Sequence, residues 1–171
     1  NRDGCAETHG VKVGCMSFFV RAAVEALKKF PLVNAAVDGR DIVYHDYQDI
    51  GSAVSTERGL LVPVLRDAGL MSFADIEKGI AEYGRRAREG TIGIEDLTGG
   101  TFTITNCGSF GSMMSTPPLY PPQSGTLGLH AIMDRTLVLT RHAELRKMMY
   151  LAMFYHLRII AGQEADHVVL S

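Results

Sequence analysis

Residues 101–105 alternate strictly between hydroxyl and apolar side chains, and this alternation constrains the fold more than any other feature. Side chains on a β-strand point to opposite faces with a period of two, so Phe102 and Ile104 share one face. Thr101, Thr103 and Thr105 share the other. The segment is therefore predicted to be a strand with one face packed on a core, and its threonine face requires an explanation of its own.

Other short runs of apolar and β-branched residues, bounded by turn signals, predict further strands. A hairpin is expected from Ile50–Ser55 and Leu60–Leu65, which are separated by the turn residues 56–59. Pro63 lacks an amide donor, which places this second strand at a sheet edge or Pro63 outside the ladder. The other expected strands are Asp41–His45, entered through a turn at Asp38 and Gly39, then Gly125–Ile132, Thr136–Thr140 and Met148–Tyr155.

Two long amphipathic helices are expected between these strands. Apolar residues recur at helical spacing over Ser17–Phe30, where Ser17 can cap the start and Pro31 stops the run. A second helix opens at Ser72, with Asp75 completing a capping box, and ends near Gly90. Many strands with about two long helices predict an α/β chain that is not a βαβ repeat. Neither a Gly-x-Gly-x-x-Gly motif nor a phosphate loop is present.

Composition narrows the class of protein. A chain of 171 residues with 46% hydrophobic content can bury the core of one domain. Its 17 basic and 19 acidic residues give a net charge of -2, so neither nucleic acid nor a membrane is an expected partner. Cys5, Cys15 and Cys107 lack metal or redox spacing, which favours reduced thiols in an intracellular compartment and no metal site. No apolar run approaches the ~20 residues that span a bilayer.

Two stretches are candidates for function. Residues 107–123 hold two glycines and four prolines, as expected of a long, stiff loop that is functional or interfacial. Tyr155–Gly162 places His156 and Arg158 at the end of an apolar strand, where they are either catalytic or satisfied structural groups. His130 also follows an apolar strand, and we interpret it as a core or interface group because no second ligand lies at metal spacing.

Several blocks together resemble the catalytic core of the dihydrolipoamide acyltransferases, the E2 component of 2-oxo acid dehydrogenase complexes. The blocks are Val54–Asp67, Asp75–Lys78, Asp96–Asn106 and Pro121–Ser124, in the order and at the spacing of that family. Residues 110–117, 129–132 and 148–152 are most similar to its succinyl-transferring branch, which serves the 2-oxoglutarate dehydrogenase complex. The similarity covers nearly all of residues 1–171, which would be the catalytic domain truncated at both ends. The lipoyl and subunit-binding domains would precede Asn1, and a last helix and strand would follow Ser171.

This resemblance implies a chloramphenicol-acetyltransferase-like α/β fold with a mixed sheet and flanking helices. It implies a homotrimer with active sites between subunits, and eight trimers in a 24-subunit cube that binds the E1 and E3 components through the missing domains. The reaction it implies is transfer of succinyl from a lipoyl arm to coenzyme A, in the tricarboxylic acid cycle of the bacterial cytoplasm or mitochondrial matrix. The resemblance does not indicate which residues bind coenzyme A, and it implies no metal.

The family's base lies in the motif Asp-His-Arg-x-x-Asp-Gly, which falls on the Tyr155–Gly162 stretch. Arg158 and Gly162 match it, but His156 stands at the first aspartate position, Leu157 at the histidine position and Ala161 at the second aspartate position. The hydroxyl that stabilises the oxyanion corresponds to Thr105, with Asn106 beside it. Leucine cannot accept a proton, and His156 is displaced by one residue, which on a strand turns a side chain to the other face.

Three interpretations follow from this mismatch. In the first, the chain is an inactive homologue that only assembles the complex. In the second, His156 serves as the base from the neighbouring position. In the third, the residues of the protein at positions 157 and 161 differ from the leucine and alanine of this sequence. Succinyl transfer is the preferred function, and the assembling scaffold is the alternative.

Overall fold

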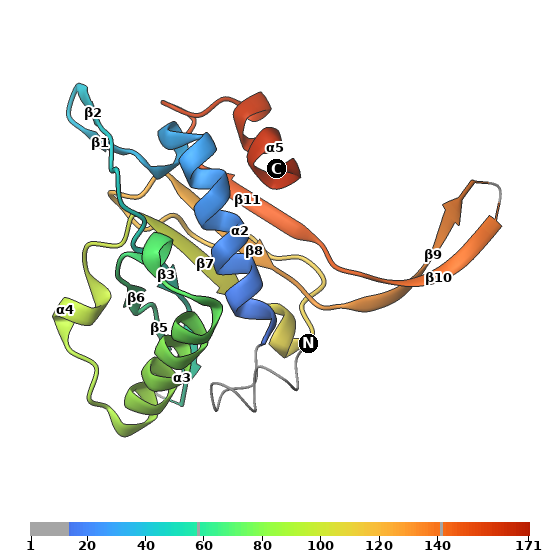
Figure 1. Cartoon of the computed structure of the whole chain (residues 1–171), viewed down its shortest axis with the longest axis horizontal. Coiled ribbons are helices and arrows are strands. Elements are labelled where there is room, and N and C mark those ends of the chain that lie inside the picture. Colours follow the sequence, from blue (N-terminus) through green and yellow to red (C-terminus); the bar gives the residue numbers. More distant parts are fainter. Residues whose placement is uncertain (1–13, 58, 141) are drawn as a thin grey trace.

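The core of the fold is a mixed sheet of five strands in the order β11–β8–β7–β3–β6 (Figure 1). The computed structural model describes residues 14–57, 59–140 and 142–171. β3 runs parallel to β7 and β7 parallel to β8, while the two edge strands, β6 and β11, are antiparallel to their neighbours. The strands are β3 (Ile50–Ser52), β6 (Val64–Leu65), β7 (Phe102–Asn106), β8 (Gly125–Leu129) and β11 (Leu151–Tyr155). The α/β fold with a mixed sheet is confirmed.

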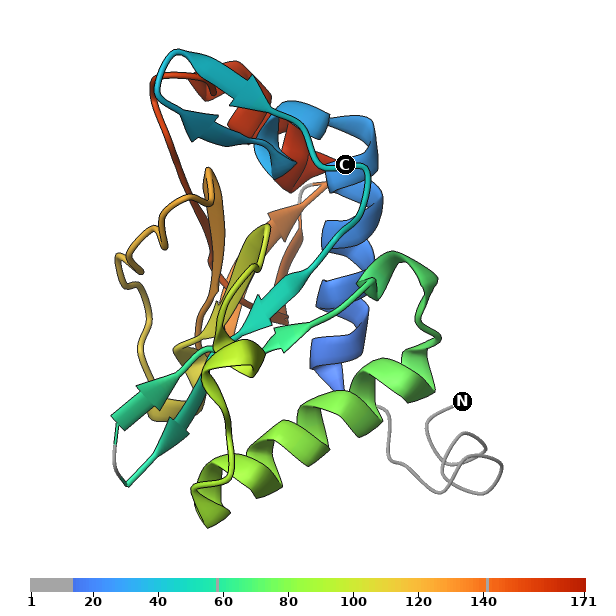
Figure 2. The ribbon, with the colours of Figure 1, turned by 90° about the vertical axis from the view of Figure 1, so that its left-hand side faces the viewer.

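Helix α2 (Cys15–Lys29) covers one face of this sheet (Figure 2). Its buried residues Val20, Val24 and Leu27 join Phe102 and Ile104 of β7 in one hydrophobic core. The predicted start of this helix at Ser17 was wrong, because the helix begins at Cys15 and the Ser17 hydroxyl donates to the Gly14 carbonyl. The first amides are instead satisfied by Glu77 of another helix, whose Oε1 accepts from Gly14 and Ser17 over 2.9 and 3.2 Å.

Helix α3 (Phe73–Glu89) begins and ends where the sequence predicts. The Ser72 hydroxyl accepts from the Asp75 amide and the Asp75 carboxylate accepts from the Ser72 amide, each over 3.2 Å, so the capping box is formed. Gly90 ends the helix with φ +71°, a left-handed conformation that glycine adopts without strain. Short helical segments elsewhere are η1 (Pro31–Asn34), η2 (Ala68–Leu70), α4 (Ile94–Leu97) and η3 (Gly108–Phe110).

The predicted hairpin of residues 50–65 forms, but it divides into two parts. β3 and β6 pair within the central sheet, whereas β4 (Val54–Thr56) and β5 (Gly59–Leu61) form a separate two-stranded sheet. Pro63 lies between β5 and β6, where only its carbonyl is used, as the acceptor for the Ser52 amide at 2.9 Å. Of the two expected placements, the edge position is confirmed, because β6 is an edge strand of the central sheet. Another hairpin pairs β1 (Ala36–Asp38) with β2 (Asp41–Val43) through a turn at Gly39 and Arg40, and β2 ends at Val43 rather than at the predicted His45.

The C-terminal third differs most from the sequence prediction. The strand expected at Thr136–Thr140 is the longer β9 (Met133–Leu139), and the strand expected from Met148 begins only at Leu151. Between them the structure has β10 (His142–Met148), which the charged segment did not predict and which pairs with β9 over its whole length. This hairpin projects from the body of the molecule (Figure 1). Helix α5 (Gly162–Leu170) was also not expected, since the next helix was placed beyond Ser171.

The threonine face of β7 is buried under the loop of residues 107–123, opposite α2 (Figure 2). Thr101 Oγ1 donates to the Asp49 carbonyl over 3.3 Å and Thr103 Oγ1 donates to Gln123 Oε1 over 2.6 Å. Thr126 of the neighbouring strand β8 donates to the Pro118 carbonyl in the same way. Hydrogen bonds to this loop and to the start of β3 therefore explain the first two threonines, but not Thr105. Among the described residues, no helix is long and apolar enough to cross a membrane.

Candidate active site

Thr105 lies at the carboxyl end of β7, beside a cleft of about 550 Å³. The residue is 9% exposed, and its Oγ1 lies 3.9 Å from the Cys107 sulfur. Four hydroxyl groups line the cleft, those of Ser52, Ser55, Thr105 and Ser109. The other lining residues are Met16, Ala53, Val54, Leu60, Ile80, Gly84, Asn106, Cys107 and Phe110. The cleft thus combines apolar walls with a few hydroxyl donors, as small-molecule sites usually do.

Backbone and side-chain hydrogen bonds hold the end of β7 in place. The Cys107 amide donates to the Leu129 carbonyl over 2.9 Å, which extends the pairing with β8 by one residue. Asn106 Oδ1 then accepts from the Gly108 amide over 3.0 Å, and the Asn106 carbonyl accepts from the Ser109 hydroxyl. These bonds turn the chain into η3 and hold the main chain that follows Thr105. Asn106 therefore supports the cleft, and its own side chain is engaged with the backbone.

The Tyr155–Gly162 stretch forms a tight turn after β11. The His156 amide donates to the Ser124 carbonyl over 2.9 Å, and the amides of Ile159 and Ile160 both donate to the His156 carbonyl over 3.1 Å. The half-buried His156 ring is held within the turn, because its Nδ1 accepts from the Arg158 amide over 3.2 Å. A neutral imidazole that accepts at Nδ1 carries its proton on Nε2. In this arrangement neither ring nitrogen is ready to take a proton from a thiol.

The other motif positions lie on the surface of the turn. Leu157 is 80% exposed. Arg158 is exposed and donates from Nη2 to the carbonyl of Gly39, at the turn of the β1–β2 hairpin, over 3.2 Å. Ala161 precedes α5, and its amide donates to Glu164 Oε2 over 3.0 Å. Gly162 is the first residue of α5. The turn presents these positions outward, away from the core of its own chain.

Thr105 and His156 do not meet within one chain. Thr105 pairs with Gly128 near the end of β8, whereas Tyr155 pairs with Gly125 at the start of the same strand. Three residues of a strand span about 10 Å, and β8 separates β7 from β11 by about 10 Å more. A hydroxyl and an imidazole at these two places cannot act on one bond unless a second copy of the chain brings them together.

His130 is fully buried at the end of β8, and its hydrogen bonds are satisfied. Its Nδ1 lies 3.0 Å from the Tyr150 carbonyl, and its Nε2 accepts from the Ser115 amide over 2.9 Å. The ring thus joins three separate segments of the chain, as expected for a core histidine. Among the described residues, which leave out Cys5 and His9, no group of three or more His, Cys, Asp or Glu residues could hold a metal ion.

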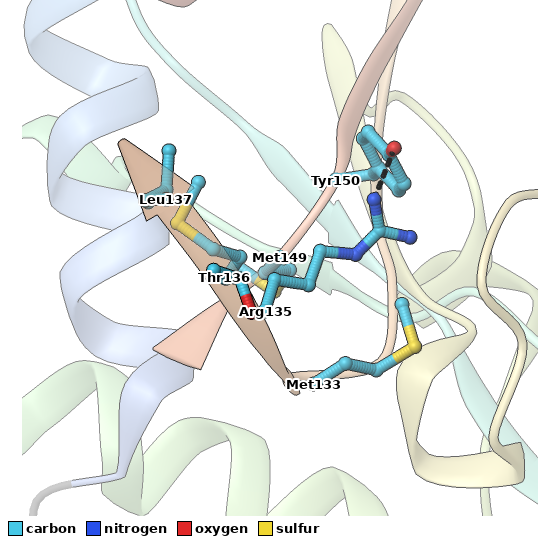
Figure 3. Close-up of a pocket in the computed structure, with 7 residues that line it drawn as sticks. Met133, Arg135, Thr136, Leu137, Met149 and Tyr150 are labelled. Carbon is cyan, nitrogen blue, oxygen red and sulfur yellow. Dashed lines mark hydrogen bonds between the residues drawn. The ribbon is translucent and has the colours of Figure 1, made fainter. Parts of the chain in front are cut away.

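A second hollow of about 230 Å³ lies at the base of the β9–β10 hairpin (Figure 3). Arg135 Nη1 donates to the Tyr150 hydroxyl over 2.7 Å, and the guanidinium carbon lies 4.7 Å from the centre of that ring. Arg135 Nη2 also contacts the Met113 sulfur at 3.4 Å. The guanidinium is therefore used to hold the hairpin base to Tyr150 and to the loop of residues 107–123. Sequence spacing gave no signal for this pair, which is 15 residues apart.

Comparison with protein families and curated proteins gives consistent matches. The family model of the 2-oxoacid dehydrogenases acyltransferase (catalytic domain) matches residues 1–169. The dihydrolipoyllysine-residue succinyltransferase component of the 2-oxoglutarate dehydrogenase complex of Cupriavidus necator is 60% identical over 164 residues, covering 96% of this chain and 39% of the relative. The Pseudomonas aeruginosa protein of the same name is 59% identical over 157 residues, covering 92% and 38%. The chain thus spans about two fifths of these relatives.

Solved structures agree on the fold. The cubic core of the pyruvate dehydrogenase multienzyme complex is similar with a TM-score of 0.93 and 28% identity, over 99% of this chain and 72% of that one. Chloramphenicol acetyltransferase is similar with a TM-score of 0.59 and 15% identity, over 98% of this chain and 78% of that one. The fold is therefore chloramphenicol-acetyltransferase-like, as the sequence resemblance implied.

Proposed function

Since the chain belongs to the family of 2-oxoacid dehydrogenase acyltransferase catalytic domains, we propose that it transfers a succinyl group from a lipoyl arm to coenzyme A. The observation that carries this proposal is the Thr105 hydroxyl, held at the end of β7 beside a cleft of about 550 Å³. Identities of 59 and 60% to succinyltransferases support succinyl as the acyl group and the 2-oxoglutarate dehydrogenase complex as the setting.

The proposed reaction is a thioester exchange, in which the succinyl group moves from the lipoyl sulfur to the sulfur of coenzyme A. The thiol of coenzyme A loses its proton, and its sulfur attacks the carbonyl carbon of the succinyl-lipoyl thioester. The tetrahedral intermediate carries an oxyanion, to which the Thr105 hydroxyl donates a hydrogen bond. The bond from carbon to the lipoyl sulfur then breaks, and that sulfur takes the proton. Coenzyme A and the lipoyl group are both substrates here, the latter carried on a separate domain, and no metal takes part.

The present sequence lacks a well-placed general base for this reaction. His156 is the imidazole that the turn offers, but its Nδ1 is occupied by the Arg158 amide. To take a proton at Nε2, the ring must adopt the other tautomer and release that amide. We therefore expect transfer by the unaltered sequence to be slow. General base catalysis contributes roughly 10²- to 10⁴-fold to such reactions.

Two copies of the chain are needed to build the proposed site, because Thr105 and His156 lie at opposite ends of β8. Exposed apolar side chains on the loop of residues 107–123 and on the projecting hairpin support subunit contact there. They are Phe110, Met113, Met114, Val138 and Leu145, all more than half exposed. We propose a homotrimer, and a 24-subunit cube by analogy with the similar cubic core.

The remaining parts of the complex are proposed from the relatives. This chain spans 39% of the Cupriavidus necator relative, and we propose that the lipoyl and subunit-binding domains, which would bind the E1 and E3 components, correspond to the part it does not span. The bacterial sources of these relatives support the bacterial cytoplasm as the compartment, with the mitochondrial matrix as the alternative.

An assay of succinyl transfer from succinyl-dihydrolipoamide to coenzyme A tests the proposal. The purified chain is compared with the variant H156D/L157H/A161D, which restores the family motif. We expect slow turnover by the unaltered chain and a gain in kcat of roughly 10²-fold or more in the variant. Trimers, measured by light scattering, that show no turnover in either form would overturn the proposed enzyme.

The alternative is a scaffold that only assembles the complex, and it rests on Leu157 and Ala161, which cannot act as base or carboxylate. Turnover by the unaltered chain comparable to that of its relatives would exclude this scaffold. Mass spectrometry of the peptide covering residues 154–163, taken from the same sample, establishes which residues the assayed protein carries. Finding Leu157 and Ala161 there means that the rate belongs to this sequence.

A further inference from the structure

Ser124 holds a buried hydroxyl at the point where the candidate catalytic turn leaves the sheet. Its side chain is 0% exposed, and its Oγ has no hydrogen-bond partner among the residues that the structure describes. A buried hydroxyl without a partner destabilises a protein, because it loses its hydrogen bonds to water and gains none. A buried hydroxyl of this kind calls for an explanation.

The pairing of β8 and β11 shows which side chain lies opposite this hydroxyl. Phe154 pairs with Thr126 and Tyr155 with Gly125, so the next antiparallel pair is His156 with Ser124. The His156 amide does donate to the Ser124 carbonyl, over 2.9 Å. Directly opposite residues of an antiparallel pair place their side chains on the same face, with Cβ atoms about 5 Å apart. A short acceptor at position 156 is thus within reach of Ser124 Oγ.

His156 does not serve as that acceptor. Its Nδ1 accepts from the Arg158 amide, and the neutral ring then carries its proton on Nε2, which is a donor. An aspartate-type side chain at position 156, with its carboxylate one methylene from the main chain, could accept a hydrogen bond from the Ser124 hydroxyl on the opposite strand. Hydrogen bonds to charged acceptors are also the stronger kind.

We propose that Ser124 is a positioning residue for the catalytic turn, and that its hydroxyl is built to bind a carboxylate side chain at position 156. This bond ties the first residue of the turn to β8 and thereby orients the residues that follow. With histidine at 156 the bond is absent and the turn is held by its own backbone alone. The expected effect of this bond on kcat rests on the proposed function. The bond itself can be tested independently, by measuring the stability of the folded chain.

A double-mutant cycle in urea unfolding measures the coupling between positions 124 and 156. The proteins are the unaltered chain, S124A, H156D and H156D/S124A. In the unaltered chain, S124A removes an unpaired hydroxyl and should leave the unfolding equilibrium constant within about threefold. In the H156D background the same change should raise it by roughly tenfold or more, because a charge-assisted hydrogen bond is lost.

Thr126 supplies a matched control, since it lies on the same face two residues along β8 and donates to the Pro118 carbonyl. T126V should have an effect of its own, but one that is equal in the unaltered and H156D backgrounds. Equal effects of S124A in both backgrounds would overturn the proposal. If H156D does not fold, H156N replaces it, since its amide oxygen also accepts; a coupling of at least about threefold is then expected, and additivity again overturns the proposal.

A kinetic readout separates positioning from a purely structural role. In a chain that carries L157H and A161D, adding H156D should raise kcat and leave KM unchanged, and S124A should reverse that gain. Coupling in the folding cycle without this effect on kcat would reject the positioning role while keeping the hydrogen bond. A chain that shows the folding coupling but no turnover in any form would instead reject the proposed function.

Discussion

Gly108 lies directly against the main chain of His130. A β-carbon built on Gly108 would come within 2.4 Å of the carbonyl carbon and oxygen of His130, closer than real β-carbons approach other atoms. The contact joins the turn that follows Thr105 to the end of β8, whose buried histidine is itself fixed by Ser115 and Tyr150. The position of the proposed oxyanion donor therefore depends on a residue that has no side chain.

The first prediction is that G108A destabilises the chain by about 2 kcal/mol, as overpacking of a close contact does. Urea unfolding measures the loss. G84A is the control, because Gly84 lies inside α3 and its added β-carbon would meet only the Arg88 side chain at 3.7 Å. That change should stabilise by about 0.5–1 kcal/mol through helix propensity. Equal stability of G108A and the unaltered chain would contradict the contact.

Removal of the Thr105 hydroxyl should slow acyl transfer. In the variant with the restored motif, T105V keeps the shape of the side chain and should lower kcat by roughly 10²- to 10³-fold, the usual effect of losing an oxyanion donor. T105S retains the hydroxyl and should keep most of the activity. Thermal unfolding of each variant checks that the fold is unchanged. A kcat for T105V close to that of its parent would rule out Thr105 as the donor.

The pair of Arg86 and Asp96 predicts how stability depends on pH. Arg86 donates to both carboxylate oxygens of Asp96, over 3.1 and 2.6 Å, and the Gly93 amide adds a bond of 2.9 Å. The Arg86 hydrogen bonds, with the Gly93 bond second, hold the pKa of Asp96 below its usual value of 3.8. The stabilisation is thus complete above pH 3.8 and is lost as the pH falls through the lower folded-state pKa.

D96N should therefore lower the midpoint of urea unfolding at pH 7 and flatten its decline between about pH 4 and pH 2. D38N, at the exposed end of β1, is the control and should keep the slope of the unaltered chain. An unchanged slope in D96N would show that the pair does not contribute to acid unfolding.

Tyr83 joins helix α3 to the edge strand β6, since its hydroxyl donates to the Val64 carbonyl over 2.9 Å. Burial, as the main cause, raises the pKa of this half-buried phenol, and Asp96 adds to the shift. Y83F should destabilise the chain by about 1 kcal/mol, the usual net contribution of one hydrogen bond. Y44F, at an exposed tyrosine, should change stability by less than about 0.5 kcal/mol. Chemical unfolding at pH 7 distinguishes the two.

Local signals predicted much of the fold correctly. The capping box at Ser72, the stop at Gly90, the strand through Ile104 and the turn at Gly39 all lie where short-range chemistry placed them. The start of α2 could not be predicted, because its first amides are capped by Glu77 from another helix. β10 was missed because its sequence is mostly polar and all of its residues are exposed, so it has no buried face, and its strand conformation comes with its pairing to β9.

Some features of the candidate site could likewise be predicted from the sequence, and others could not. The sequence by itself determined the family, the Thr105 hydroxyl on a strand, and the absence of an acceptor at Leu157 and Ala161, since these depend only on which residues occur at which spacing. Only the tertiary structure decided that Thr105 and His156 lie at opposite ends of β8, and that Ser124 lies unpaired opposite the turn. The physical reason is strand register, which pairs residues far apart in the chain and leaves no trace in local sequence.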